Sequence, residues 1–390
     1  MSKKAFWVLL IAAFSSMLGL GIISPFLPGF AEEHGANGFW LGMIFAGFGF
    51  SRTIIMPVVG KLFDKSRGKI IVTSGLVLYA VVSLFYPLAD SVFSLIVVRV
   101  VHGFAAGMIT PIVMAYVGIY TEKGKEAVTT GALNMMFYLG LAAGPFFGGI
   151  LNFFFGFDSV FYVMAGLGII TFLMVLFFIP NRIEPLLTEG DAENKERIRP
   201  FKSLIQSNFI KAILIITALI TFMIVSFLAL VPSLAIIKHI DAVHIGIIIS
   251  IGIFLGGVLQ IPLGKFADQR DTSGKLIIIG IGTSIGMLSL LAMPFCPGFK
   301  ALLIAGIFMG IGAGLSAPAL SGIAVVIGKT AGMGNWMGIF FCVKSLSFVF
   351  TPIIAGIIMD FVGIDATFYT LAILGFFGGW AFVHYLRKKN

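Results

Sequence analysis

Twelve long apolar runs follow one another along this 390-residue chain, and they limit its fold more than any other feature. Each run is close to the roughly 20 residues that an α-helix needs to cross about 30 Å of hydrocarbon. Only 11% of the residues are charged, against about 25% in soluble domains. The runs are too long for the strands of an outer-membrane barrel, which have roughly 10 residues each. We therefore predict an all-α membrane protein with twelve transmembrane helices.

The predicted spans fall into two sets of six. The first set lies near residues 5–30, 38–60, 70–89, 91–119, 127–152 and 158–180, and the second near 208–236, 243–263, 275–295, 300–326, 335–358 and 363–386. The basic start of the chain before an apolar run is also typical of a signal peptide, but the run continues past Pro28 without a convincing cleavage site. We interpret it as an uncleaved first helix.

The basic residues indicate the topology. Of the 26 Lys and Arg residues, 21 fall on one side of the predicted spans and only Lys238 and Lys300 fall on the other. Cytoplasmic loops carry an excess of Lys and Arg, so both termini and the 181–207 loop are expected in the cytoplasm. The net charge of +9 is therefore a topology signal, and we expect no nucleic-acid partner. The two cysteines have neither a metal-ligand spacing nor an obvious disulfide partner.

The two halves of the chain repeat each other. Residues of the first half recur 207 positions later in the second, or 204 positions later for the segment around Asp64. The matched pairs are Gly103/Gly310, Gly107/Gly314, Pro111/Pro318, Pro25/Pro232, Gly144/Thr351, Pro145/Pro352 and Asp64/Asp268. We predict two six-helix bundles, 1–180 and 208–390, joined by a polar cytoplasmic linker at 181–207. Because both bundles begin on the same side, the repeat is parallel, with a pseudo-two-fold axis along the membrane normal.

Three motifs in the expected helices carry a family resemblance. They are Gly60-Lys61-Leu62-Phe63-Asp64-Lys65 after the second helix, Arg99-Val100-Val101-His102-Gly103 in the fourth, and Gly140-x-x-x-Gly144-Pro145-x-x-Gly148-Gly149 in the fifth. They resemble the loop, fourth-helix and antiporter motifs of the major facilitator superfamily, the last being typical of its drug:proton antiporters. The resemblance covers essentially the whole chain and implies that the substrate binds between the halves.

The sequence departs from the family pattern at two places. The second glycine of the loop motif normally follows the aspartate by three residues, whereas here it is Gly68, one residue later. The first helix resembles that of tetracycline-type exporters, yet Ser16 stands where those often carry Asp. The second departure argues against proton coupling by an acid in this helix.

The resemblance assigns conformational gating to Gly60, Asp64, Lys65, Asp268 and the fifth-helix residues Gly140, Gly144, Pro145, Gly148 and Gly149. A physical argument supports this for Asp64, because an anion at the end of the second helix can face the positive amino end of another helix, which we expect to be the eleventh near Asn335. The alternatives are that Asp64 and Lys65 are solvated loop charges, and that the glycine-proline segment only packs tightly.

Three basic residues lie near the middle of predicted spans, namely Arg52, Arg99 and Lys344, whereas all 17 acids fall in loops or at helix ends. A cation at the bilayer centre costs at least roughly 2.5 kcal/mol, so it should face a wet cavity or a partner. The family resemblance implies that the second and eleventh helices meet between the halves and that the fourth lines the cavity. We therefore expect Arg52 and Lys344 to approach one central volume, with Arg99 on its wall, and to bind an anionic group of the substrate. The alternative is that backbone carbonyls hold Arg99 and that Arg52 reaches polar groups in its own half.

Neutral polar groups extend this candidate site. His102 lies three residues from Arg99, on nearly the same helix face, and is a proton carrier or a hydrogen-bonded core histidine. Lys344 is a second candidate for proton coupling, because a desolvated lysine can lose its proton. Asn134 and Tyr138 share a helix face by their spacing of four and can supply hydrogen bonds to a substrate.

These observations favour a secondary transporter that exports a small organic or amphipathic molecule, similar to drug:proton antiporters. An organic-anion exchanger or a lysolipid translocator with a cationic central site is the alternative. An enzyme is disfavoured because the spans contain no nucleophile-base pair or metal cluster, and a receptor because no sizeable soluble domain is present. We expect a monomer in the cytoplasmic (inner) membrane, with a small-molecule substrate, protons as a coupling ion, the lipid bilayer as its environment, and no cofactor.

Overall fold

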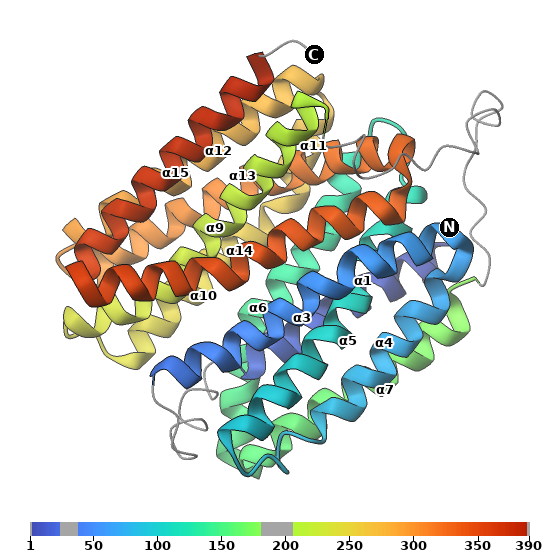
Figure 1. Ribbon diagram of the computed structural model, residues 1–390, viewed down its shortest axis with the longest axis horizontal. Helices are drawn as coiled ribbons and strands as arrows, with labels where there is room; N and C mark the ends of the chain where they lie inside the picture. Colours follow the sequence, from blue (N-terminus) through green and yellow to red (C-terminus); the bar gives the residue numbers. More distant parts are fainter. Residues whose placement is uncertain (1, 24–37, 181–205, 388–390) are drawn as a thin grey trace. The chain divides into compact units, whose positions relative to one another are not determined.

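The computed structural model describes residues 2–23, 38–180 and 206–387. These residues form helices joined by turns, and no strand occurs among them (Figure 1). Eleven stretches of the described chain are long and apolar enough to cross a membrane. One of them, Gly42–Ser83, has 42 residues, about twice the length that a crossing requires. It contains α3 (Gly38–Leu62) and α4 (Gly68–Ser83), separated by the short helix η1 (Phe63–Arg67), and thus accounts for two of the twelve predicted helices.

The remaining helices follow the predicted order. They are α1 (Lys3–Ile23), α5 (Val92–Ile119), α6 (Glu126–Phe155), α7 (Phe157–Phe178), α9 (Asn208–Ile237), α10 (Ala242–Val258), α11 (Gln260–Asp268), α12 (Thr272–Ala292), η3 (Met293–Phe295), α13 (Phe299–Ala331), α14 (Met333–Val362) and α15 (Ile364–Arg387). The expected linker at 181–207 lies outside the described residues except for its last two positions, and so do Pro25 and Pro28.

Two predicted spans differ from the observed helices. The third was expected to reach residue 89, but α4 ends at Ser83 and turns follow, because Pro87 has no N–H to continue a helix. The eighth is divided at Leu259 into α10 and α11. Pro262 lies one turn beyond this division and lacks an N–H for the helical ladder. The side chain of Gln260 supplies a donor there, since its Nε2 donates to the carbonyl of Gly256 at 2.9 Å.

The chain divides into two compact units. Unit 1 contains Met1–Glu122, Met136–Ile198 and Val325–Ser345, and unit 2 contains Lys123–Met135, Arg199–Ala324 and Leu346–Asn390. Each unit therefore consists mostly of one half of the sequence and includes a short segment of the other half. These segments are the start of α6 in unit 2, and the end of α13 with the start of α14 in unit 1.

The helices of unit 2 pack against one another as the corresponding helices of unit 1 do. In unit 1, α7 packs against α1 and α4, and α5 packs against α1, α3 and α4. In unit 2, α15 takes the position of α7 and packs against α9 and α12. The core of unit 1 includes a cluster of Leu20 from α1, Phe48 from α3 and Ala106 from α5. Phe48 is also the residue around which several candidate site residues gather.

Candidate functional site

Asp64 binds the amino end of α14. Its Oδ1 accepts a hydrogen bond from the backbone N–H of Gly334 and its Oδ2 one from Asn335, both at 2.7 Å. The first N–H groups of a helix have no partner within the helix and carry part of the positive end of its dipole. The carboxylate satisfies two of these donors in unit 1. The position expected for Asp64, near Asn335, is thereby confirmed.

Glycines let α3 and α14 approach closely beside this contact. A Cβ atom on Gly60 would collide with the backbone carbonyl of Gly334, and one on Gly338 would lie 2.5 Å from the carbonyl oxygen of Met56. Real Cβ atoms essentially never come within 3.0 Å of another heavy atom in this way. The small residues at 60, 334 and 338 therefore allow Asp64 to reach the N–H groups of α14.

The shifted glycine of the loop motif, Gly68, follows a break in the helix that carries Asp64. The helical path breaks at Lys65 and Ser66, and Ser66 has a φ of 60°, a left-handed conformation that non-glycine residues adopt with difficulty. Gly68 has an ordinary helical φ of −56°. Its importance is steric, because a Cβ atom there would lie 2.6 Å from the ring of Phe63. Lys65 is exposed at this turn.

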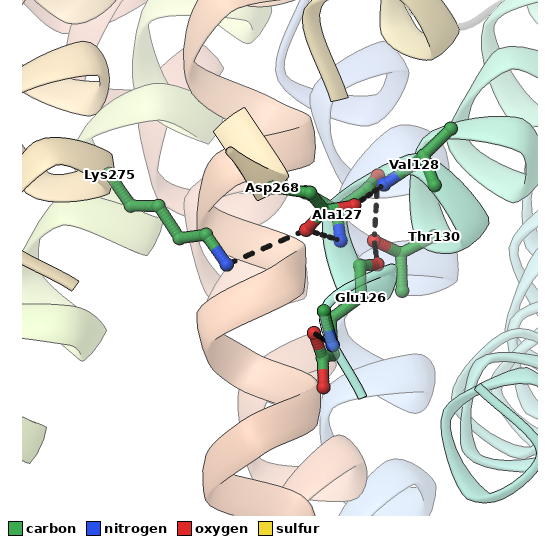
Figure 2. A network of polar contacts seen from close by, with 7 residues as sticks. Glu126, Ala127, Val128, Thr130, Asp268 and Lys275 are labelled. Carbon is green, nitrogen blue, oxygen red and sulfur yellow. Dashed lines mark hydrogen bonds and ion pairs between the residues drawn. The ribbon is translucent and has the colours of Figure 1, made fainter. Parts of the chain in front are cut away.

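Asp268 makes the equivalent contact in unit 2 (Figure 2). Its Oδ1 accepts from the N–H of Ala127 and its Oδ2 from that of Val128, both at 2.8 Å, at the amino end of α6. The Nζ of Lys275 lies 3.5 Å from Oδ1 and adds an ion pair. Asp268 follows Asp64 by 204 residues, and Gly334 and Asn335 follow Ala127 and Val128 by 207. The two contacts are therefore repeat copies, which we call the twin aspartate contacts.

The close helix approach is also repeated. A Cβ atom on Gly264 would lie 2.7 Å from the carbonyl oxygen of Ala127, and one on Gly131 would lie 2.6 Å from that of Gln260. Gly264 corresponds to Gly60, and Gly131 to Gly338. The second residue of the partner helix is not conserved between the copies, since Ala127 stands where the first contact has Gly334. The geometry of helix packing is thus copied together with the aspartate.

Arg52, Arg99 and His102 gather around the ring of Phe48 in unit 1. The guanidinium carbons of Arg52 and Arg99 lie 5.3 and 4.6 Å from its centroid, and the His102 ring meets it edge-on at 5.3 Å. Arg99 is 1% exposed and its Nε donates to the carbonyl of Ile44 at 3.4 Å. This geometry matches the alternative in which a backbone carbonyl holds Arg99. Arg52 is 6% exposed, and its Nε has no hydrogen-bond partner among the described residues.

His102 is enclosed by aromatic residues. Its Nδ1 lies 2.9 Å from the hydroxyl of Tyr86, and the rings of Tyr79 and Tyr86 meet it at centroid distances of 4.9 and 5.8 Å. The side chain is 1% exposed. His102 does share a helix face with Arg99, because both contact Phe48.

Lys344 contacts a different set of rings from the two arginines. Its Nζ lies 4.6 Å from the centroid of Phe340 and 5.1 Å from that of Phe341, on the same helix. Unlike Arg99, it is only partly buried. The neighbouring Ser345 donates to the carbonyl of Gly49 on α3 at 3.0 Å, which brings this part of α14 beside the helix that carries Arg52. The structure thus assembles Arg52 with Arg99 and places Lys344 against other aromatic partners.

The remaining candidates lie on α6. Asn134 donates from Nδ2 to the hydroxyl of Ser321 on α13 at 3.0 Å, and Tyr138 is half-buried one turn further along. Gly144 approaches the backbone of Gly21 on α1 so closely that a Cβ would collide with it, and a Cβ on Gly140 would lie 2.5 Å from the carbonyl of Phe14. Pro145 is exposed, Gly148 is buried, and a Cβ on Gly149 would meet open space. Two of the five motif residues therefore pack α6 onto α1.

Comparison with known proteins now decides the family. A sequence profile described as the Major Facilitator Superfamily matches residues 9–296 and 271–390. The chain belongs to this superfamily. It is a membrane transporter and not an enzyme. Its similarity to named members extends over almost the full length of each.

Two relatives within the superfamily are similar to this chain over most of its length. An uncharacterized MFS-type transporter of Methanocaldococcus jannaschii is 27% identical over 100% of this chain and 99% of its own length. The quinolone resistance protein NorA of Staphylococcus aureus is 26% identical over 94% of this chain and 92% of its own. The solved structure of the human organic anion transporter MFSD10 (TETRAN) superposes with a TM-score of 0.80 at 15% identity, covering 97% of this chain and 99% of that one. That likeness shows the superfamily fold.

Several contact residues in this superfamily member were not predicted from the sequence. Phe48 precedes Arg52 by four residues, a helical spacing that could have identified it as a partner. Ala127 and Val128 could have been found by subtracting the repeat length from Gly334 and Asn335. No sequence signal indicates the hydrogen bond from Ser345 to Gly49, since it depends on how two distant helices pack.

Proposed function

We propose that the chain is a secondary transporter that works by alternating access and exports a small organic or amphipathic molecule from the cytoplasm. The observation that carries this proposal is the pair of twin aspartate contacts. Each joins a helix of one sequence half to the first turn of a helix from the other half, within one compact unit. A transport cycle that moves the halves must break and remake both contacts.

The energy of these contacts suits a reversible latch. A hydrogen bond to a charged group contributes about 1.5–3 kcal/mol, and each aspartate accepts two. Shifting a two-state equilibrium from one side to the other requires roughly 5.5 kcal/mol of differential binding. The contacts are therefore strong enough to favour one state, yet weak enough for substrate or proton binding to overcome them.

The direction of transport and the coupling ion belong to the same proposal. Export of drug-like molecules is supported by the relative NorA, whose name describes quinolone resistance, and by the fifth-helix motif around Gly144 and Pro145. Protons are the proposed counter-ion, with Lys344 and His102 as candidate carriers. We place the monomeric protein in the cytoplasmic membrane with both termini inside.

Transport by purified protein in proteoliposomes tests this function. With an imposed pH gradient, we expect movement of the quinolone norfloxacin against its concentration gradient, and loss of this movement when nigericin collapses the pH gradient. Protein carrying both Asp64→Asn and Asp268→Asn serves as the matched control, and we expect it to transport more slowly. Equal norfloxacin movement with and without the pH gradient would exclude proton-coupled export.

A second candidate function is transport of an anionic molecule. Lys344 supports it, because its ammonium group contacts only aromatic rings among the described residues and remains partly exposed. An unpaired cation in a span is stable mainly where water or an anion can reach it. Uptake of fluorescein, an anion, compared with ethidium, a cation, separates this candidate from export of cationic drugs. Faster movement of ethidium than of fluorescein would argue against the anionic substrate.

A further inference from the structure

A groove runs along α4 and α7 in unit 1. It has a volume of about 340 Å³ and is lined by Thr73, Ser74, Val77, Leu78 and Val81 of α4 and by Phe172 of α7. This volume lies at the lower end of the range for small-molecule sites, about 300–1,000 Å³. Val77 and Val81 are 43% and 46% exposed, so the groove opens on the surface of the unit.

The chemistry of the groove changes in steps along α4. Lys69, Thr73, Val77 and Val81 are spaced by four and therefore share one helix face. From the basic end inward, the order is an ammonium group, a hydroxyl group and two apolar side chains. A phospholipid has the same order, with its phosphate first, its ester oxygens next and its acyl chain last.

Ser74 gives independent support for a bound polar group. Its side chain is exposed in the groove and makes no hydrogen bond among the described residues. Thr73 differs, because its hydroxyl donates to the carbonyl of Lys69 at 2.8 Å. A hydroxyl on a membrane-crossing helix is stable when it finds a partner, and a lipid ester oxygen can accept its hydrogen bond.

We propose that this groove binds an anionic phospholipid. Its phosphate pairs with Lys69, its ester oxygens accept a hydrogen bond from Ser74, and one acyl chain lies along Val77, Leu78 and Val81 against Phe172. The long stem of a lysine can lie on apolar surface while its ammonium group stays at the interface. The exposed Lys65 and Arg67 add positive charge at the same end of α4 and favour a lipid with net negative charge.

Native mass spectrometry of the full-length protein in detergent tests the site with two lipids, phosphatidylglycerol and phosphatidylcholine. We expect the wild type to retain roughly fivefold or more phosphatidylglycerol than phosphatidylcholine. One lysine near the lipid surface contributes about 1 kcal/mol to the binding of an anionic lipid, which corresponds to this factor. Lys69→Gln should reduce the preference, with Lys65 and Arg67 left to attract the anionic lipid. Val77→Trp should fill the groove and reduce retention of both lipids.

Two variants control for unspecific effects. Lys123→Gln removes an exposed loop charge, and Ile281→Trp enlarges an exposed residue of α12, which corresponds to α4 in the repeat. Both should retain phosphatidylglycerol as the wild type does, and circular dichroism melting should show that all four variants are folded. An absent preference in the wild type, or an unchanged preference in Lys69→Gln, would overturn the proposal.

Discussion

The Oδ1 atom of Asp64 accepts a hydrogen bond of 2.7 Å from the backbone N–H of Gly334, the second residue of α14. These residues are 270 positions apart in the chain and belong to different halves of the repeat. Asp268 repeats the relationship with Ala127. A local sequence motif thus functions through a distant helix end, and the same arrangement occurs twice.

The glycines beside Asp64 should tolerate no side chain. We expect Gly60→Ala or Gly334→Ala to destabilise the contact by about 1–3 kcal/mol, the usual effect of overpacking. The reciprocal change Ala127→Gly should have a smaller effect, because alanine already fits at the repeat position. Thermal melting of the three variants, with Gly149→Ala as a control whose Cβ meets open space, measures the difference. Equal melting temperatures for Gly60→Ala and Gly149→Ala would contradict the packing argument.

The aromatic surroundings of His102 allow its two possible roles to be separated. His102→Phe removes the hydrogen bond between the Tyr86 hydroxyl and Nδ1 of His102, and the loss of such a bond costs about 0.5–1.5 kcal/mol. The double variant with Tyr86→Phe should recover part of that stability. A structural histidine leaves the pH dependence of transport unchanged in the stable double variant. A shift of the pH profile in that variant would instead assign proton carriage to His102.

Lys344→Gln tests the cationic site while keeping the length and hydrogen-bonding ability of the side chain. If an anionic group binds there, transport of fluorescein should fall by about tenfold, equivalent to ~1.4 kcal/mol, while transport of neutral molecules changes little. Phe340 and Phe341 would also lose their cation contact, so the folded yield must be compared in parallel. The anion site would be refuted if the wild type mainly transports a cationic drug and Lys344→Gln transports that drug at the same rate.

The distribution of the basic residues predicts the topology. Reporter fusions after Asn390 and within 181–207 should both report a cytoplasmic location, because 21 of the 26 basic residues fall on that side. Fusion after Ile240, in the turn between α9 and α10, provides the opposite control. A signal from outside the cytoplasm at Asn390 would overturn the predicted orientation.

Much of the fold could be predicted from the sequence because the bilayer imposes it. Apolar runs of fixed length define the helices, and the offsets of 204 and 207 residues define the repeat. The helix ends were less predictable, as the early end of α4 at Ser83 and the division at Leu259 show. Proline residues and local hydrogen bonds determine where these helices end, and the hydrophobicity of the sequence does not reveal these ends.

The candidate site could be predicted only in part. Asp64 was placed correctly because a carboxylate at a helix end has few suitable partners, and a helix amino end is one of them. The contact of Phe48 with the two arginines was missed because only its spacing of four from Arg52 distinguishes it from the other 40 phenylalanines. The contacts of Lys344 with Phe340 and Phe341 also depend on side-chain packing, which a count of charges does not supply.

Distance measurement by electron spin resonance tests the latch most directly. Spin labels at Arg67 and Thr330, both exposed in unit 1, report the separation of the loop after α3 from the segment before α14 in protein carrying Cys296→Ser and Cys342→Ser. We predict that adding Asp64→Asn with Asp268→Asn increases the ratio of the long-distance to the short-distance population by roughly tenfold or more. The reason is that charge-assisted hydrogen bonds of about 1.5–3 kcal/mol each are lost. An unchanged distance distribution, together with transport at the wild-type rate, would contradict the account.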